Sequence, residues 1–274
     1  MQVTRPPSVM CPVESTFMTP DEYVHLVLQK YSVAAGPQSP VVSTAMFFKV
    51  LAEQWAGNAL RSVSVAGSFA KGTAVSSSLV GGSDVDLFIS LKAENTNTMN
   101  ELYEMLFRWA TEKGWTPKRQ NVSIGITSGN IAVDLVPAKY QAGSLEDHTI
   151  YVRRGDTWKK TNVLAHMTYV GQSGHLAEIK ALKIWKRLHG LDFLSFYVEL
   201  FAIRALRNRS TTSVAENMRI VLRAIADNLG QWQIVDPANT NNIISDQHTQ
   251  GEKQKIAAQA AKSLLATNWN QIIW

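Results

Sequence analysis

Two aspartates, Asp84 and Asp86, stand out because their spacing places two carboxylates side by side. They open the segment 84–91, in which polar and apolar residues alternate as they do in a β-strand. Side chains at positions i and i+2 of a strand share one face, so both carboxylates point the same way and repel each other unless a cation lies between them. A Gly67-Ser68 turn precedes them. Hard oxygen ligands beside such a phosphate-binding turn suggest Mg²⁺ holding a nucleoside triphosphate, although an isolated Asp-x-Asp pair can also be a turn cap.

A third carboxylate, Asp134, lies in the middle of the otherwise apolar strand predicted for residues 130–137. Ile131, Val133 and Leu135 alternate, so Asp134 projects from the opposite face. A buried, unpaired carboxylate costs several kcal/mol, so Asp134 needs a metal, a cation or a proton. If the two strands pair, the three carboxylates converge as ligands for two metal ions about 3.5–4 Å apart, the arrangement used in phosphoryl transfer.

The composition is that of an ordinary globular protein of 274 residues, 45% of them apolar and 18% charged. We expect no transmembrane helix, because no run of about 18 apolar residues occurs, and no signal peptide, because the N-terminal segment lacks an apolar core. The single cysteine, Cys11, excludes an intramolecular disulfide and predicts a cytoplasmic location. No cluster of Cys and His suggests structural zinc.

The net charge of +5 is unevenly distributed along the chain. Residues 178–209 contain seven Lys or Arg and three acidic residues, which accounts for +4 of that charge. A basic region beside a carboxylate site suits a polyphosphate ligand, but it also suits RNA. Charge alone does not distinguish the two.

Apolar periodicity predicts a mixed chain that becomes helical in its second half. Thr19, Pro20 and Glu22 form a capping box, and the next helix is predicted to bury Phe47, Val50, Leu51 and Trp55. The strand–helix–strand order followed by a hairpin predicts a small mixed sheet with helices on one face. We interpret His148 and His166, which stand alone in the sequence, as residues with a structural or surface role. The predicted helices are 19–31, 43–57, 97–113, 176–189, 214–229 and 252–267, with one more starting at Ser195.

Several segments together resemble the DNA polymerase β-type nucleotidyltransferases. Within that superfamily the sequence most resembles the oligoadenylate synthase/cGAS branch and its bacterial DncV-like relatives, the CD-NTases, and class I CCA-adding enzymes share the pattern. The segment 74–83 is longer than is usual in the family. The residues that carry the resemblance are Gly67-Ser68, Lys71-Gly72-Thr73, Ser83-Asp84-Val85-Asp86 and Val133-Asp134-Leu135-Val136-Pro137.

Three later motifs extend the resemblance. In the family a Lys before an apolar residue and Trp, here Lys183, reaches the β- and γ-phosphates, although Lys180, Lys183 and Arg187 could equally form a solvated face. Ser195 matches a Ser whose hydroxyl contacts the triphosphate, and by itself it is typical of a helix N-cap. The following Glu199 is mostly structural in the family. The segment 236–242 matches a family motif, with Thr240 where Pro is usual, and by itself it is an Asx/Pro turn.

The resemblance implies an α+β fold: a polymerase β-like sheet with flanking helices in residues 1–160, then a helical nucleotide-binding lobe in residues 161–274. The active site would lie in the cleft between them. Asp84 and Asp86 would hold two Mg²⁺ ions, for which Mn²⁺ could substitute, and Asp134 would bind the catalytic ion and help to deprotonate the attacking hydroxyl. The implied nucleotide-binding residues are Gly67, Ser68, Lys183, Ser195 and Asn242.

The implied activity is synthesis of cyclic di- or trinucleotides from ATP and other NTPs in antiphage signalling. Partners would be an operon-encoded regulator and an effector activated by the cyclic nucleotide, without a membrane. One alternative is an RNA 3′-terminal, CCA-type nucleotidyltransferase, but such enzymes usually carry a further RNA-binding domain beyond the helical lobe. A non-catalytic nucleotide-binding relative is a second alternative, which the electrostatic cost of an empty triad disfavours.

Overall fold

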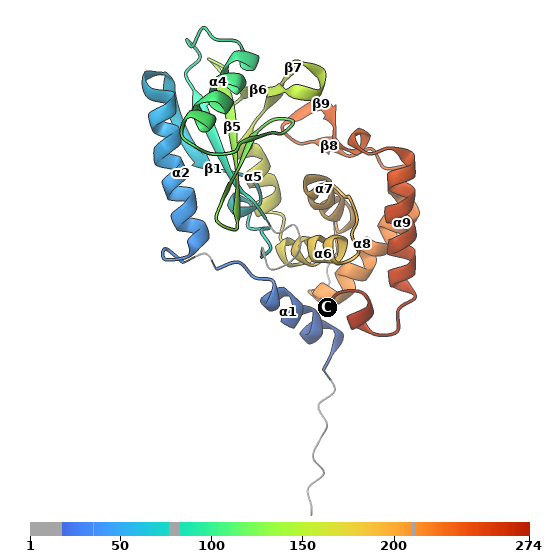
Figure 1. The fold of residues 1–274 in the computed structure, drawn as a ribbon. Helices are drawn as coiled ribbons and strands as arrows, with labels where there is room; N and C mark the ends of the chain where they lie inside the picture. The colour runs from blue at the N-terminus through green and yellow to red at the C-terminus, as the bar shows by residue number, and fades with distance from the viewer. Residues whose placement is uncertain (1–17, 35, 77–82, 210–211) are drawn as a thin grey trace, which may run out of the picture.

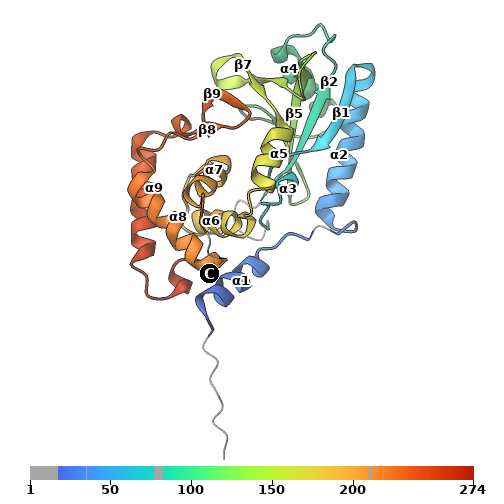
Figure 2. The ribbon, with the colours of Figure 1, turned by 180° about the vertical axis from the view of Figure 1, so that it is seen from behind.

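The structure is a computed structural model that describes residues 18–34, 36–76, 83–209 and 212–274. The expected N-terminal arm, Cys11 and most of the long segment 74–83 lie outside these residues. A sheet occupies one end of the molecule and a group of helices the other (Figures 1 and 2). This is the predicted α+β arrangement, a sheet with flanking helices followed by a helical lobe.

The helices and strands follow one another in this order. Through the sheet they are α1 (Pro20–Lys30), α2 (Pro40–Ala56), β1 (Leu60–Val65), α3 (Gly67–Ala70), β2 (Val85–Leu91), α4 (Met99–Glu112), β3 (Lys118–Arg119), β4 (Ile124–Ser128), β5 (Ile131–Tyr140), β6 (His148–Val152) and β7 (Thr157–Thr161). They continue as α5 (Val163–Gly171), α6 (Leu176–Leu188), α7 (Ser195–Ala205), α8 (Val214–Asn228), β8 (Val235–Asp236), β9 (Asn239–Ile243) and α9 (Gln250–Leu264).

The capping box predicted at Thr19 is present, and two further helices, predicted from 97 and 252, begin at Met99 and Gln250 after capping boxes of the same kind. Thr19, Thr98 and Thr249 each accept a hydrogen bond from the backbone N–H three residues later, and the glutamate there bonds back. α4 buries the predicted face of Met99, Leu102, Tyr103, Leu106 and Ala110.

The prediction for α2 is wrong in its start and in part of its buried face, although the predicted Leu51 and Trp55 do pack, partly buried, against the core. The helix begins at Pro40, after the cap Ser39, and it buries Ala45, Phe48 and Ala52. The predicted core residues Phe47 and Val50 are 54% and 51% exposed. Apolar residues surround this helix almost completely, so periodicity could not select the buried stripe. The stripe with two alanines allows the closest approach to the sheet.

Within the part of the chain that the structure describes, the sheet has seven strands, and β2 and β5 at its centre are parallel. Its order is β1-β2-β5-β4-β3, and β6 pairs with the far end of β5 and with β7. β2 and β5 run in parallel with Asp86 opposite Asp134, while β1 and β4 flank them in antiparallel orientation. The predicted hairpin between β4 and β5 is present, with its turn at Gly129 and Asn130.

Both faces of the sheet are covered, so the expectation of helices on one face only was incomplete. One face packs against α2 and α4. On the other face Phe88, Ala138 and Ile150 form a smaller cluster with Val163 at the start of α5, and α5 lies in front of the sheet in Figure 2. This second layer buries Phe88, which simple alternation in β2 would place at a surface.

A separate core joins α6, α7, α8 and α9. α6 lies at its centre, and Ile179, Leu182 and Trp185 are fully buried there. α1 also belongs to this core, through Val24 and Val27, and it lies beside the C-terminal end of the chain in Figure 1. The expected division at residue 160 assigns α1 to the sheet lobe, whereas its side chains pack in the helical lobe.

The closing residues pack on the body, as predicted from their apolar character. Ile272 and Ile273 are fully buried. The hydroxyls of Tyr23 and Tyr31 in the α1 region donate to the carbonyl oxygens of Ile273 and Trp274, at 3.1 and 2.9 Å. The first helix is therefore tied to the last residues.

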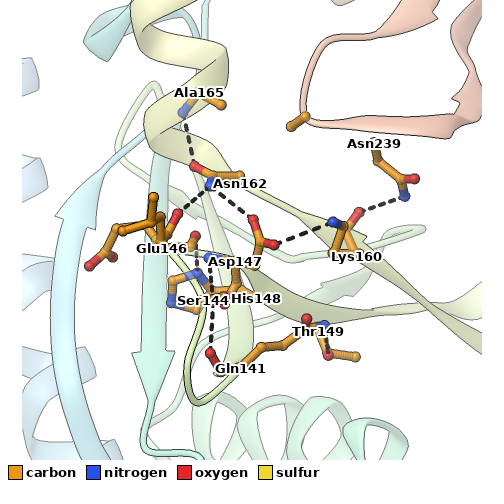
Figure 3. A network of polar contacts seen from close by, with 12 residues as sticks. Gln141, Ser144, Glu146, Asp147, His148, Thr149, Lys160, Asn162, Ala165 and Asn239 are labelled. Atoms are coloured by element: carbon orange, nitrogen blue, oxygen red, sulfur yellow. Dashed lines mark hydrogen bonds and ion pairs between the residues drawn. The ribbon is translucent and has the colours of Figure 1, made fainter.

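A polar network joins the end of the sheet to the helical lobe (Figure 3). Asp147 accepts hydrogen bonds from Asn162, which also caps α5, and from Lys160 of β7. The backbone oxygen of Lys160 accepts from Asn239 of the β8–β9 hairpin at 3.0 Å. His148 is buried in this region with Ser90 Oγ 2.8 Å from its Nε2, which agrees with a structural role.

None of the helices in the described part of the chain is long and apolar enough to span a membrane.

Candidate active site

The three aspartates meet at one end of the central strands. Asp84 immediately precedes β2, Asp86 is its second residue, and Asp134 is the direct neighbour of Asp86 on β5. Neighbouring residues of parallel strands project to the same face, so the two carboxylates lie side by side. The predicted pairing of the two strands is confirmed.

Burial and mutual repulsion make these carboxylates unusually basic. Burial, reinforced by Asp84, raises the pKa of Asp86 to about 6. Burial, with the charges of Asp86 and Asp84, raises the pKa of Asp134 to about 7. The pKa of Asp84 is raised by burial too, although Arg187 opposes the shift. The cluster therefore favours protons or cations.

Gly67 lets the turn that it forms with Ser68 approach Asp86 closely. Its φ is +61°, and a Cβ there would lie 1.7 Å from Asp86 Oδ2, so no other residue fits without moving the carboxylate. The N–H of Ala66 donates to the carbonyl oxygen of Asp86 at 2.8 Å. Within the described residues the Ser68 hydroxyl has no hydrogen-bond partner, so it is free to bind a ligand beside the carboxylates.

The chemistry of this donor set fits Mg²⁺, which prefers carboxylate oxygens together with phosphate oxygens. In the described ranges, no three His, Cys, Asp or Glu side chains are already arranged to hold a metal ion. One oxygen of Asp134, Oδ1, accepts a hydrogen bond from Gln120 at 2.7 Å. Metal binding would therefore need the carboxylates to turn toward the ion, and the raised pKa values of Asp86 and Asp134 favour such a cation.

Lys183 lies in a buried ionic network that connects the two lobes. Its ammonium group donates to Glu199 Oε1 at 2.8 Å, and to the carbonyl and hydroxyl oxygens of Thr73 at 3.1 Å each. Glu199 also accepts from Lys71 at 2.5 Å and from the Thr73 hydroxyl at 2.7 Å. Burial alone would raise the pKa of Glu199, but Lys183 and Lys71 outweigh it and lower the pKa.

The geometry gives Lys183 no free N–H for a phosphate. Three N–H groups meet three acceptors, and the residue is 1% exposed. The predicted contact between Lys183 and the triphosphate would require this network to open, and that assignment remains a prediction.

Lys186, one turn further along α6, is the lysine that contacts Ser195. Its ammonium group donates to Ser195 Oγ at 3.0 Å and to the carbonyl oxygen of Phe193. Burial, aided by Arg187, lowers the pKa of Lys186 to about 7. Ser195 is the first residue of α7, and Leu194 holds the cap position without a side-chain hydrogen bond. The predicted N-cap role of Ser195 is therefore wrong, because its hydroxyl bonds Lys186 instead.

Arg187 and Asn242 are two further polar residues whose positions bear on the predicted site. Arg187 is the basic residue that interacts electrostatically with Asp84, and its buried Nη1 has no partner among the described residues. Asn242 donates to Asp236 at 2.9 Å, and His166 lies 2.7 Å from the other oxygen of Asp236. The structure thus places Asn242 in a closed hairpin network, and its predicted contact with nucleotide is untested.

A pocket of about 510 Å³ opens beside Asp84. Its walls come from the α1–α2 linker, Phe69 and the β4–β5 turn, with Asn130 and Ala132 on one side. Its size is that of a small-ligand site. Of the three aspartates Asp84 alone lines it, and its lining among the described residues includes none from α6 or α7.

Sequence reasoning missed two polar residues of this site, Gln120 and Lys186. Gln120 lies in a short turn that no periodic pattern marks. Lys186 follows Trp185 in the same basic run as Lys183, and only the position of Ser195 in space distinguishes the two lysines.

No protein-family model matches this sequence, and a search of curated proteins finds no match. The fold, however, is shared with solved structures and is that of the CD-NTases, as predicted. CdnG from Bradyrhizobium diazoefficiens, a CD-NTase in complex with GTP, superimposes with a TM-score of 0.73 at 12% identity, over 92% of this chain and 92% of that one.

Two more solved structures show the same likeness. CdnC from E. coli MS115-1 with ATP has a TM-score of 0.69 at 17% identity, over 90% and 91% of the two chains, and CdnC was also solved in complex with HORMA-deltaN. CdnE from Elizabethkingia meningoseptica, a cyclic dinucleotide synthase with GTP and Apcpp, has a TM-score of 0.65 at 14% identity, over 91% and 98%.

Proposed function

We propose that this chain is a nucleotidyltransferase that joins NTPs, ATP among them, into cyclic di- or trinucleotides. The observation that carries the proposal is the in-register pairing of Asp86 with Asp134 beside the Gly67-Ser68 turn. Three clustered carboxylates next to a phosphate-binding turn suit phosphoryl transfer, and the CD-NTase fold supports a cyclic product.

In the proposed site each group has a separate task. Two Mg²⁺ ions, or Mn²⁺, would be held by Asp84, Asp86 and Asp134 and would supply charge neutralisation at the reacting phosphate. Asp134 accepts the proton of the attacking ribose hydroxyl. Ser68 binds the triphosphate from the sheet lobe, and Ser195 with Lys186 binds it from the helical lobe.

We assign the terminal phosphates to Lys186 rather than to Lys183. Lys186 Nζ reaches the Ser195 hydroxyl, and because that hydroxyl accepts from Lys186, its own hydrogen remains available for a phosphate oxygen. Arg187, whose buried Nη1 is unpartnered among the described residues, would add a second positive charge near Asp84.

We further propose that the product acts as a second messenger in cytoplasmic antiphage defence, with an operon-encoded regulator and a cyclic-nucleotide-activated effector. The structural likeness to CdnC of E. coli supports this proposal. CdnC was solved with ATP and in complex with HORMA-deltaN, which favours a nucleotide donor and a protein regulator for this chain as well. We propose both a preference for ATP as donor and the dependence on a regulator.

The activity is tested by incubating the purified chain with four labelled NTPs and Mg²⁺ in the absence of RNA. A soluble product that resists phosphatase and has the mass of a cyclic nucleotide supports the proposal, and the Asp134→Asn variant is the control. Product formed only by elongation of an added RNA 3′ end would replace the proposal with the terminal-transferase alternative. No reaction in either case would indicate a nucleotide-binding relative.

Lys186→Met should raise the KM for ATP by roughly ten- to a hundredfold with little change in kcat, because a charge-assisted contact is worth about 1.5–3 kcal/mol. In the wild type the KM should also rise as pH increases through about 7, where Lys186 loses its proton. Initial-rate kinetics from pH 6 to 9 measure both effects.

The matched control is Lys180→Met on the same helix, since Lys180 lines a different pocket with Gly72 and His25. An equal rise in KM from Lys180→Met would indicate a diffuse basic surface, as for RNA, and would remove the assignment of Lys186.

Mg²⁺ together with a non-hydrolysable ATP analogue should stabilise the chain. At a nucleotide concentration a hundredfold above Kd the gain is about 2.7 kcal/mol, or roughly 5–10 °C in Tm for a chain of this size. Nucleotide with EDTA should raise the Tm far less, because the negatively charged triphosphate would then lie beside three carboxylates without a metal ion between them. Thermal unfolding followed by fluorescence measures the shift. An identical shift with and without Mg²⁺ would contradict a metal-bridged triphosphate.

A further inference from the structure

The turn between β3 and β4 is fixed rigidly beside the carboxylates. The N–H of Gln120 donates to the carbonyl oxygen of Ser123 at 3.0 Å. The buried Tyr103 hydroxyl lies 2.6 Å from the carbonyl oxygen of Gln120 and 3.2 Å from that of Ser123. From the other side, the N–H of Arg153 donates to the carbonyl oxygen of Asn121 at 2.8 Å. Gln120 therefore projects from a firmly held backbone.

The side-chain amide of Gln120 contacts Asp134 in a defined orientation. Its Nε2 donates to Asp134 Oδ1 at 2.7 Å, and its Oε1 accepts from Ser123 Oγ at 3.1 Å. With the amide reversed, two oxygens would face each other at Asp134, so the network itself assigns the nitrogen to the carboxylate. Gln120 thus engages Oδ1 of Asp134, and the Ser123 side chain, which also bonds Gln120, interacts with the same carboxylate and lowers its pKa.

Gly125 provides the space for this contact. It is paired with Asp134 across the β4–β5 ladder. A Cβ at Gly125 would lie 2.6 Å from Gln120 Nε2 and 3.2 Å from Asp134 Oδ1. A glycine inside a strand weakens it and commonly marks a close approach. Here the approach is that of the Gln120 amide to Asp134.

We propose that Gln120 is a positioning residue for Asp134: its amide fixes Oδ1, so that Oδ2 is directed to the metal ion and the attacking hydroxyl. This inference rests on the proposed function, in which Asp134 binds the catalytic ion. Groups that hydrogen-bond a ligating carboxylate orient it, and their loss typically costs about 10- to 100-fold in metal affinity or activity.

The test compares Gln120→Met with Gln141→Met. Both remove a glutamine amide from the residue that directly follows a strand of the sheet, but Gln141 bonds Thr149 at 2.9 Å in another turn, at the far end of β5. Gln120→Met should lower kcat about 10- to 100-fold, with KM for ATP within about twofold of wild type. Mn²⁺ affinity, measured by electron paramagnetic resonance with a non-hydrolysable ATP analogue, should weaken about tenfold. Gln141→Met should change neither.

Two further variants separate positioning from general stabilisation. Gly125→Ala should reproduce the loss in kcat and in Mn²⁺ affinity, because its methyl group displaces the Gln120 amide and lies 3.2 Å from Asp134 Oδ1, while both polar residues remain. In an Asp134→Asn background, Gln120→Met should have no further effect on Mn²⁺ affinity, since it acts through the missing carboxylate.

The inference is overturned if Gln120→Met matches Gln141→Met in Mn²⁺ affinity, or if it tightens Mn²⁺ binding, which would mean that Gln120 holds Asp134 away from the ion. Because Mn²⁺ binding is measured without turnover, this result is independent of the cyclic product. A wild-type protein that binds Mn²⁺ but makes no product would refute the proposed function and leave the role of Gln120 in metal binding intact.

Discussion

Asp86→Asn should abolish product formation while making the metal-free protein more stable near pH 7. The variant loses a ligand of the metal ions, whose charge stabilisation is worth several kcal/mol, so the rate should fall by roughly a thousandfold or more. At the same time it removes a buried carboxylate from a cluster in which Asp84 and Asp134 repel it. We expect a gain of about 1–3 kcal/mol in the free energy of unfolding without metal.

The gain in stability should depend on pH in a defined window. Burial and Asp84 raise the pKa of Asp86 from 3.8 to about 6. Because the folded protein binds this proton more tightly than the unfolded chain, its contribution is complete below about pH 4 and is lost as pH rises through about 6. Asparagine has no proton to lose. The stability difference between variant and wild type should therefore grow from pH 4 to pH 7.

Urea unfolding at pH 4, 5.5 and 7 in EDTA measures this difference, and the labelled-NTP assay measures turnover. Asp227→Asn on the exposed face of α8 is the control for loss of a single negative charge. Product formation at a near-native rate by Asp86→Asn would rule out its metal-binding role, and a stability difference independent of pH would rule out the raised pKa.

Lys183→Met should destabilise the fold by about 3–5 kcal/mol, because it removes the more deeply buried of the two lysines that pair with the buried carboxylate of Glu199. Glu199 is fully buried, and its ion pair with Lys183 is 2.8 Å long. For a chain of this size the loss corresponds to roughly 10 °C in Tm. Thermal and urea unfolding measure it.

Two comparisons isolate the ionic contribution. Adding Glu199→Gln to Lys183→Met should recover part of the loss, since both charges of the pair are then gone. Lys186→Met should cost less, because this buried lysine bonds the neutral acceptors Ser195 and Phe193. If Lys183→Met retained the wild-type Tm and raised only the KM for ATP, Lys183 would be the phosphate ligand that the sequence first indicated.

Much of the fold could be predicted because several segments carry strong local signals. The capping boxes of α1 and α4 and the buried stripe of α4 are fixed by residues three or four apart, so they are visible in the sequence. α2 could not be oriented, since its apolar residues surround it and only the shape of the sheet selects the alanine stripe. The second layer over Phe88 depends on α5, far along the chain.

Some residues of the candidate site could be identified from the sequence and others could not. Asp84, Asp86 and Asp134 were identifiable because strand alternation fixes the face of each side chain, and strand pairing then brings them together. The roles of Lys183 and Lys186 could not be identified in this way, because both lie in one basic run on α6. They differ only in their tertiary contacts, since Lys183 bonds Glu199 and Lys186 bonds Ser195. Gln120 could not be identified because its contact with Asp134, and the bonds from Tyr103 and Arg153 that hold its turn, join residues far apart in the sequence.

The attachment of α1 to the end of the chain has a consequence for folding during synthesis. The strands of the sheet, residues 60–161, can pair before the helical lobe is complete. α1 leaves the ribosome before all of them, yet its partners Ile272 and Ile273 leave more than 200 residues later. Such a long-range contact is slow to form. α1 is therefore made well before α6, α8 and the residues 272–273 that cover it, and until they follow, its apolar stripe is available to chaperones.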